Sequence, residues 1–259
     1  MAQGDGGMTD VAIALLLVAV AVLLSRVQKL KMESEIVVAA ARAIVQLVAI
    51  AFLIDVVFEH LGFSGLLLGA MLVAASLTAG RRLRGVPAAS WIAAASIATS
   101  TSVVLVILFG ASVFPFEPRW LIAIAGMAIG NSMTAVSLAG SRLRDELVDK
   151  ADEVEARLAL GVRASDALKT YTRRAVTNGM IPILDATKNV GLILVPGAFV
   201  GMLLGGASPA DAARVQLVVL FMLLGAVAVS AVSITALVAR AFIGPGERVL
   251  LPAPELEAR

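Results

Sequence analysis

Seven long apolar runs constrain this chain more than any other feature of its sequence. They cover residues 8–25, 36–57, 63–79, 91–109, 120–139, 190–206 and 215–239. A helix of about 20 residues crosses the hydrocarbon layer of a bilayer. The runs lack the strict alternation of a transmembrane barrel, so helices are the only way to keep their backbones hydrogen-bonded in lipid. The sequence therefore predicts an all-α fold of seven transmembrane helices in one domain over 1–259.

The composition agrees with a membrane protein and excludes several kinds of chemistry. Hydrophobic residues make up 59% of the chain and charged residues 15%, which is more apolar than one soluble core of this size can absorb. The chain has no cysteine, which excludes disulfides and thiolate metal sites, and its single histidine excludes a multi-histidine centre. A net charge of +2 gives no reason to expect nucleic-acid binding.

The distribution of positive charge predicts the orientation in the membrane. Eighteen of the 21 Lys and Arg residues fall in the segments on one side of the seven predicted spans, and such an excess marks the cytoplasmic side. The first run follows a leader without Lys or Arg and lacks a small-residue cleavage site, so we read it as a helix rather than a signal peptide. The chain is predicted to have its N-terminus outside and its C-terminus in the cytoplasm.

A long charged segment, 141–189, separates the fifth and sixth predicted spans on the cytoplasmic side. Its first part continues the fifth span as a helix, because apolar residues recur every three or four positions along one face. That face is made of Leu143, Leu147, Ala151, Val154 and Leu158. The charged residues between them lie mainly on the other face, so this part is predicted to be an amphipathic helix.

The same segment then turns and starts a second helix. Gly161 is a helix stop, and Ser165 with Asp166 forms an expected N-cap for a short helix over 167–178. Pro182 is expected to end or kink that helix before the sixth span. The predicted result is a compact helix–turn–helix projection into the cytoplasm.

No motif for energy conversion occurs in the chain. The sequence contains no G-x-x-x-x-G-K-[ST], no H-E-x-x-H and no G-x-S-x-G. We therefore expect it not to be an enzyme, and any ATP that drives it must be hydrolysed by another chain.

The projection carries a short signature of ATP-driven transporters. In "EARLALG", Glu155, Ala156 and Gly161 have the spacing of the E-A-A-x-x-x-G motif of bacterial ABC importer permeases, in which a cytoplasmic helix docks on the ATPase. Arg157 replaces the third motif position, and Pro182 lies farther from the glycine than that pattern requires.

A wider resemblance covers nearly the whole chain. The stretches "AARAIVQL", "GMAIGNSMTAVSLA" and "GGASPADAARVQLVV", with the "RRA", "IP" and "VGL" signals between the last two, resemble the FetB/YbbM family of ABC permeases. Members of that family are described as bacterial iron exporters and are related to plant aluminium-sensitivity permeases. The resemblance implies a permease of the bacterial inner membrane, forming a homodimer and pairing with a separate ATP-binding subunit.

The resemblance also implies where that subunit would bind. ATP and Mg would be held by the partner, and this chain would bind no cofactor. The ATPase-facing residues would be Glu155, Ala156, Gly161, Arg163, Asp166, Arg173 and Arg174.

One motif departs from the family pattern and bears on the cargo. The family's Leu-Pro-Gly-Met-Met-Thr-Gly is replaced by "VPGAFVG", so Ala198 and Phe199 stand in place of the two methionines and Val200 in place of the threonine. Val215 stands where a tyrosine often precedes Gln216. If those methionines handle a metal in relatives, this chain handles it differently or carries another cargo.

Polar residues inside the spans are candidates for a translocation pathway, because they are costly at membrane depth. The candidates are Arg42, Gln46, Asn131, Ser132, Thr134, Asp185, Lys188, Asn189, Pro196 and Gly197. Each group also has a structural explanation. Arg42 can snorkel to the cytoplasmic surface, the polar residues of the fifth span can hydrogen-bond between helices, and Asp185 can form a local ion pair with Lys188.

Three residues at the outer end of the second span form a weak candidate for a metal site. Asp55, Glu59 and His60 offer oxygen and nitrogen ligands within two turns. Acidic residues at helix edges are common, and that explanation stays open beside the metal site.

Two other classes of protein remain as alternatives to an ABC permease. An ion-gradient-driven secondary transporter or channel would need no ATPase, but it predicts buried carboxylates in mid-span. Asp55 and Asp185 both lie near the predicted membrane edges. A membrane scaffold or receptor would explain the projection but leaves the polar residues of the second and fifth spans without a role.

Overall fold

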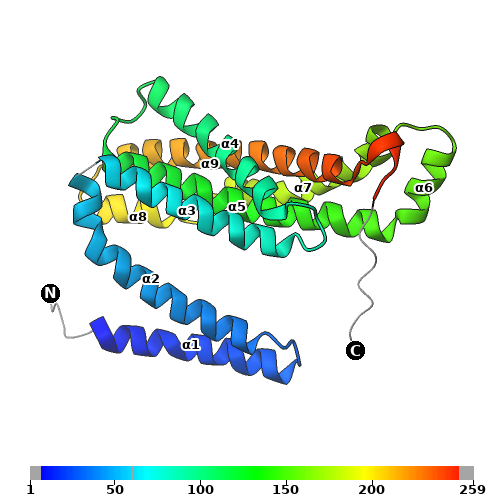
Figure 1. Ribbon diagram of the computed structural model, residues 1–259. Coiled ribbons are helices and arrows are strands. Elements are labelled where there is room, and N and C mark those ends of the chain that lie inside the picture. Colours follow the sequence, from blue (N-terminus) through cyan, green and yellow to red (C-terminus); the bar gives the residue numbers. More distant parts are fainter. Residues whose placement is uncertain (1–6, 60, 251–259) are drawn as a thin grey trace. The chain divides into compact units, whose positions relative to one another are not determined.

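The computed structural model is all-helical over the residues that it describes, 7–59 and 61–250, with side chains described over 9–53 and 61–250. The helices are α1 Gly7–Val27, α2 Glu33–Glu59, α3 Leu61–Arg82, α4 Ala89–Gly110, α5 Pro118–Asp149, α6 Ala151–Ala159, α7 Ala164–Asn189, α8 Gly197–Leu204 and α9 Pro209–Phe242, followed by the 3₁₀ turn η1 Pro245–Glu247 (Figure 1). Within these ranges, six helices are long and apolar enough to cross a membrane: α1, α2, α3, α4, α5 and α9.

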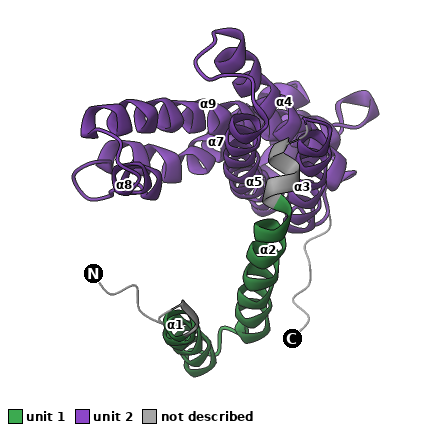
Figure 2. Cartoon of the chain, turned by 90° about the vertical axis from the view of Figure 1, so that its left-hand side faces the viewer, with its two compact units in different colours: residues 1–59 green, residues 60–259 purple. Residues whose placement is uncertain are grey.

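The chain divides into two compact units, 1–59 and 60–259 (Figure 2). The first contains the hairpin of α1 and α2. Its turn is closed by Ser25, whose carbonyl accepts from the Leu30 N–H at 2.9 Å and whose hydroxyl accepts from the Met32 N–H at 3.1 Å. Most side chains described on these two helices are exposed and apolar, as expected for helices that face lipid or a partner.

The second unit is built around the two longest helices, α5 and α9. Helices α3, α4 and α7 pack on them, and α4 and α7 each contact both. Small side chains line these contacts: Ala93, Ala139 and Ala231 are completely or almost completely buried against Ile97 and Ile234. Small residues let membrane helices approach closely, which favours packing where lipid supplies no hydrophobic drive.

One expected span is wrong. Over 190–206 only α8, of eight residues, is helical, and eight residues rise about 12 Å, too little to cross a bilayer. The preceding helix compensates, because α7 runs from the α6 end back along α5 and α9 (Figure 1). In place of the expected sixth span, the chain has the second half of α7, a non-helical linker over 190–196, and α8. We call these three segments together the return path. The number of crossings and their orientation stay predictions.

Helix α7 also differs from its expected form. The predicted short helix over 167–178 is part of one 26-residue helix, and Pro182 lies inside it instead of ending it. A proline in a helix interior removes a hydrogen bond and costs about 3 kcal/mol. Burial of Ala175, Gly179 and Ile183 in the bundle offsets that cost and holds the helix together.

The close approach of α3 and α4 depends on Gly80. A Cβ atom there would lie 2.7 Å from the Cα and 2.9 Å from the backbone nitrogen of Ser90. Gly80→Ala is therefore expected to destabilise the protein by about 2 kcal/mol, because backbone has to shift. Gly65→Ala on the same helix is the matched control: nothing lies within 4 Å of its Cβ position, and alanine is the better helix former. Thermal unfolding in detergent measures the effect: the midpoint temperature should be lowered by Gly80→Ala and not by Gly65→Ala.

Candidate functional site

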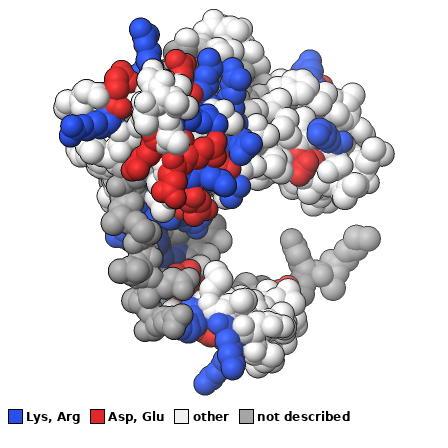
Figure 3. All heavy atoms as spheres, turned by 90° about the vertical axis from the view of Figure 1, so that its right-hand side faces the viewer, with Lys and Arg blue, Asp and Glu red and all other residues white. Residues whose placement is uncertain are grey.

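Helix α6, the turn 160–163 and the first turns of α7 form a projection at one end of the second unit, which we call the tip. Its interior is apolar: Val154, Leu168 and Tyr171 are almost completely buried. The expected apolar face is confirmed in part, since Leu143 and Leu147 are fully buried as well, but the single helix expected to carry it is interrupted: α5 ends at Asp149 and α6 begins at Ala151. Charged side chains of both signs gather on this end of the molecule (Figure 3). The tip is thus a packed element with a polar surface.

The turn of the tip is held by a regular helix-ending motif. Gly161 has φ +83°, its N–H donates to the Leu158 carbonyl at 2.9 Å, and the Val162 N–H donates to the Arg157 carbonyl at 3.1 Å. These two bonds form the Schellman motif, which needs a left-handed residue at the position of Gly161. The predicted stop at Gly161 is confirmed. Just before it, the Leu160 side chain is 84% exposed at the apex.

The expected N-cap of α7 is wrong. The helix begins at Ala164, before Ser165 and Asp166, and neither its N-cap residue Arg163 nor any neighbour supplies a side-chain cap. Instead, the Ala164 N–H donates to Glu247 Oε2 at 2.7 Å. A residue 83 positions away replaces the local cap, which sequence spacing alone cannot reveal.

Arg157 makes an ion pair within α6 and contacts an aromatic ring of α7, and the second contact joins the two helices of the tip. Arg157 pairs with Glu153 at 2.7 Å and lies 5.8 Å from the centroid of the Tyr171 ring. The nearby Tyr171 hydroxyl, which is buried without a hydrogen bond of ordinary geometry, and then the Arg157 guanidinium hold the pKa of Glu153 below its usual value. Burial, and then the Glu153 carboxylate, raise the pKa of Tyr171. At neutral pH the carboxylate is therefore charged and the phenol neutral.

The residues predicted to face an ATPase divide into two groups. Glu155, Ala156, Gly161 and Arg163 are exposed on α6 and its turn, and Asp166 is exposed on the first turn of α7. The exposed pair Arg173 and Arg174 lies ten residues beyond Arg163 on a continuous helix, which is about 15 Å along its axis. A partner that touches both groups must cover the tip and one side of α7.

The polar residues of α5 separate by face. Ser132 is fully buried and shares a 2.8 Å hydrogen bond with Ser100 of α4. Asn131 and Thr134 lie on another face and donate to their own helix, Asn131 to the Met127 carbonyl at 2.9 Å and Thr134 to the Gly130 carbonyl at 3.3 Å.

A cavity of about 120 Å³ lies where Asn131 and Thr134 meet α7 and α9. Its remaining lining residues are Ala135, Gly179, Pro182, Ile183, Ala186 and Val227. The expectation that Asn131 and Thr134 share a face is thus confirmed. Ser132 takes part in helix packing and lies apart from this cavity.

The end of α7 breaks the return path beside a second cavity. Gly191 has φ +84°, and the Asn189 carbonyl accepts from the N–H groups of residues 192, 193 and 194. Pro196 and Gly197 then start α8. A cavity of about 360 Å³ adjoins the break, lined by Val190, Gly191, Val195, Pro196, Phe199, Ala213, Gln216 and Leu217.

Gln216 is the polar side chain of this cavity, and sequence reasoning did not select it. Its Oε1 atom is buried and accepts no hydrogen bond. Buried polar groups are normally paired, so an unpaired amide oxygen on a cavity wall is a candidate ligand contact. Two departures from the family motif meet here, since Phe199 lines the cavity and Val215 directly precedes Gln216.

The expected ion pair between Asp185 and Lys188 is wrong. Both side chains are exposed on the last turns of α7, and the ion pairs within 4 Å among the described side chains lie elsewhere. In unit 1, Arg42 and Gln46 are exposed one turn apart on α2. Asp55, Glu59 and His60, the weak metal candidates, lie outside the residues whose side chains the structure describes.

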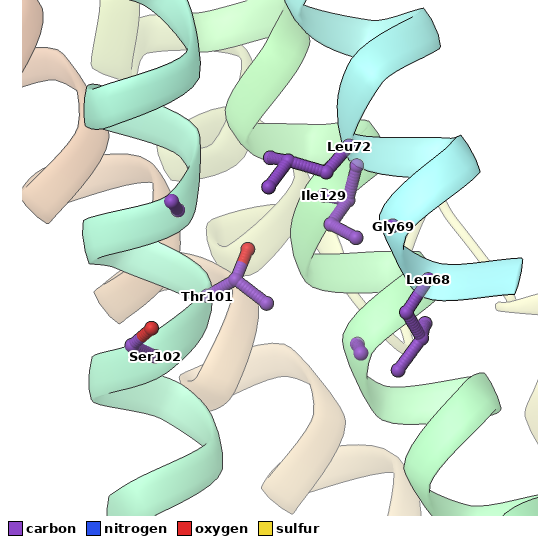
Figure 4. A pocket seen from close by; sticks show the side chains of 8 residues that line it. Leu68, Gly69, Leu72, Thr101, Ser102 and Ile129 are labelled. Carbon is purple, nitrogen blue, oxygen red and sulfur yellow. The ribbon is translucent and has the colours of Figure 1, made fainter. Parts of the chain in front are cut away.

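A third cavity, of about 180 Å³, contains a polar group that the sequence did not single out. It lies between α3, α4 and α5, and the Thr101 side chain projects into it near Ile129 and Leu72 (Figure 4). The Thr101 hydroxyl is buried without a hydrogen-bond partner, whereas Ser96 and Thr99 of the same helix donate to their own backbone. Such a hydroxyl is suited to hold a water molecule.

Together, the apolar helices define a helical multi-pass membrane protein with a polar tip. Comparison with known proteins identifies the family to which the chain belongs. The model of the uncharacterised protein family UPF0014 matches residues 8–243, and the chain belongs to this family.

Relatives occur in plants and bacteria. The chain is 40% identical over 231 residues to Protein ALUMINUM SENSITIVE 3 of Arabidopsis thaliana, covering 88% of this chain and 85% of that one. It is 41% identical over 238 residues to UPF0014 membrane protein STAR2 of Oryza sativa, covering 91% and 84%. It is 30% identical over 225 residues to the "Probable iron export permease protein FetB" of Escherichia coli, covering 86% and 87%. No solved structure matches the chain.

Proposed function

We propose that this protein is the membrane-spanning subunit of an ABC transporter that exports a metal ion such as iron. ATP and Mg are bound and hydrolysed by a separate subunit, and this chain carries no cofactor of its own. The complex contains two copies of the chain in the bacterial inner membrane. Membership of UPF0014 and the similarity to the probable iron export permease of E. coli support this role.

The packed tip is the observation that supports an ATPase partner most directly. Val154, Leu168 and Tyr171 are buried inside it, while Leu160 is exposed at its apex. A packed element can transmit a rigid-body displacement, and an exposed apolar side chain at its apex can enter a groove on a partner. Because α7 continues without interruption from the tip into the bundle, a displacement of the tip moves the α7 residues that line the first cavity and the end of α7 from which the lining of the second cavity begins.

The cargo is proposed to pass along α7 where the two cavities lie. The first is lined by Asn131 and Thr134, and the second by Gln216 and the break after α7. Breaks in membrane helices free backbone groups at the bilayer interior, and transporters use such breaks to bind ions and substrates.

A transport experiment tests this function. Inside-out vesicles that contain the chain and an ATP-binding subunit should take up iron when ATP is added, and vesicles without that subunit should not. In cells, deletion of the gene should raise the iron content under iron load, with manganese and aluminium loads as parallel comparisons. Uptake at the full rate without any ATPase would replace the ABC assignment with the ion-gradient alternative. Unchanged content of all three metals would remove metal export.

A further inference from the structure

The chain after α9 folds back on itself and forms a short closed turn. The Gly244 N–H donates to the Arg248 carbonyl and the Leu250 N–H to the Phe242 carbonyl, each at 2.7 Å. Ile243 and Val249 form a bridge between the two sides of the turn. Phe242, at the end of α9, is almost completely buried. The turn is therefore attached firmly to α9.

Glu247 has an unusual backbone conformation in this turn. Its φ is +60°, directly after Gly246 at +73°. Residues other than glycine rarely adopt a positive φ, because the Cβ atom then approaches the carbonyl oxygen. Strained conformations of this kind persist where surrounding contacts hold them, and they are enriched at functional positions. We therefore expect that a contact of the Glu247 side chain holds the backbone in this conformation.

That contact is the cap of α7. Glu247 Oε2 accepts from the Ala164 N–H at 2.7 Å, and Ala164 is fully buried as the first residue of the helix. Negative charge at a helix N-terminus is favourable, because it pairs with the positive end of the helix dipole and with N–H groups that have no helical partner. The carboxylate of the turn after α9 is therefore placed at the start of α7, inside the tip.

We propose that Glu247 is a positioning residue that ties the tip to the end of α9. Through this bond, a displacement of the tip reaches the bundle along α9 as well as along α7. Helix α9 packs on α4, α5 and α7, so the tie couples the tip to most of the second unit. The role in transport rests on the proposed function, whereas the tie itself is a property of this chain.

The tie can be measured on the chain alone by electron paramagnetic resonance. The protein has no native cysteine, so spin labels attach only at Leu160→Cys and Arg240→Cys, and doubly labelled chain diluted into excess unlabelled chain reports the distance between the tip and α9 of one copy. Glu247→Gly removes the carboxylate but suits the positive φ of this position, so the turn should keep its fold. We expect the distance distribution to broaden at least twofold in this variant.

Two further variants separate the tie from general damage to the turn. Glu247→Gln keeps an oxygen acceptor for the Ala164 N–H and should retain a narrow distribution. Arg248→Ala changes the next side chain and keeps the backbone bond to Gly244, and it should also resemble the parent. An unchanged width in Glu247→Gly would overturn the proposal. Equal broadening in Arg248→Ala would do the same, because the turn as a whole would then hold the tip.

The amount of cargo transported per ATP distinguishes a coupling role of Glu247 from a purely structural one. In vesicles with the ATP-binding subunit, Glu247→Gly should transport at least fivefold less cargo per ATP hydrolysed, while the affinity for the subunit changes less than threefold. Unchanged cargo per ATP would contradict the coupling role. If no ATP-binding subunit drives transport by the parent chain, the proposed function fails. The distance measurement then still tests whether Glu247 ties the tip to α9.

Discussion

Gly161→Pro is expected to abolish binding of the ATP-binding subunit to this chain. Proline fixes φ near −65°, whereas Gly161 has φ +83° and donates its N–H to the Leu158 carbonyl. The substitution removes both the conformation and one of the two bonds that end α6, so α6 and α7 can no longer form the same tip. Co-purification from membranes and titration in lipid nanodiscs measure the effect, with a loss of at least a hundredfold in affinity expected.

The neighbouring positions provide the controls for this prediction. Asparagine tolerates the left-handed conformation better than other non-glycine residues, so Gly161→Asn should retain most of the affinity. Glu155→Lys reverses an exposed charge on α6 without disturbing the turn, and we expect it to weaken binding about tenfold. Wild-type affinity in a folded Gly161→Pro protein would locate the ATPase elsewhere on the chain.

Gln216→Leu is expected to have opposite effects on transport and on stability. The buried Oε1 of Gln216 has no partner, and an unpaired buried polar group costs about 1–3 kcal/mol. Leucine removes this cost at nearly the same volume, so the thermal unfolding midpoint should rise. If the oxygen contacts cargo, the rate of ATP-driven transport should fall at least tenfold.

A matched variant and a restoring variant sharpen this result. Thr99 is exposed and its hydroxyl is paired with the Ala95 carbonyl of its own helix, so Thr99→Val should leave transport unchanged. Phe199→Met places the family's residue back on the cavity wall, and we expect it to change the preference among iron, manganese and aluminium. A Gln216→Leu protein that transports at the parent rate would remove this cavity from the pathway.

Local patterns predicted much of the fold correctly, because they depend on neighbours in the chain. The 3.6-residue spacing of Leu143, Leu147 and Val154 gave the buried face, and Gly161 marked the helix end because only a left-handed residue fits the Schellman motif. Six of the seven apolar runs correspond to long helices in the described ranges.

The errors share a cause, which is that tertiary contacts override local preference. Apolarity over 190–206 predicted a span, but Gly191 and Pro196 interrupt it and α7 extends to Asn189 in its place. Ser165 and Asp166 are good capping residues, yet the cap comes from Glu247. Tertiary contact also decides which glycines allow close packing: a Cβ atom at Gly80 or Gly179 would lie against a neighbouring helix.

The candidate site was only partly visible in the sequence. Asn131 and Thr134 were recognised from their polarity in an apolar run, and the cavity brings them together with α7. Gln216 was noted only beside a departure from the family motif. The Gln216 amide oxygen is buried next to Gly191 because α9 packs against the end of α7, 25 residues earlier in the chain. The residue spacing within α9 does not predict that contact.

The linker over 190–196 has a mechanical consequence for the return path. A continuous helix is stiff along its whole length, so tilting one end tilts the other. Here the helix is interrupted, so a change in a few backbone dihedral angles of the linker would alter the angle between α7 and α8, with rearrangement of the hydrogen bonds that the turn makes to the Asn189 carbonyl. Because α7 is packed on α5 and α9 whereas α8 contacts α9, the joint lets the angle between α7 and α8 differ from that of a straight helix without disturbing either set of contacts. The cavity at the joint would change its volume with that angle.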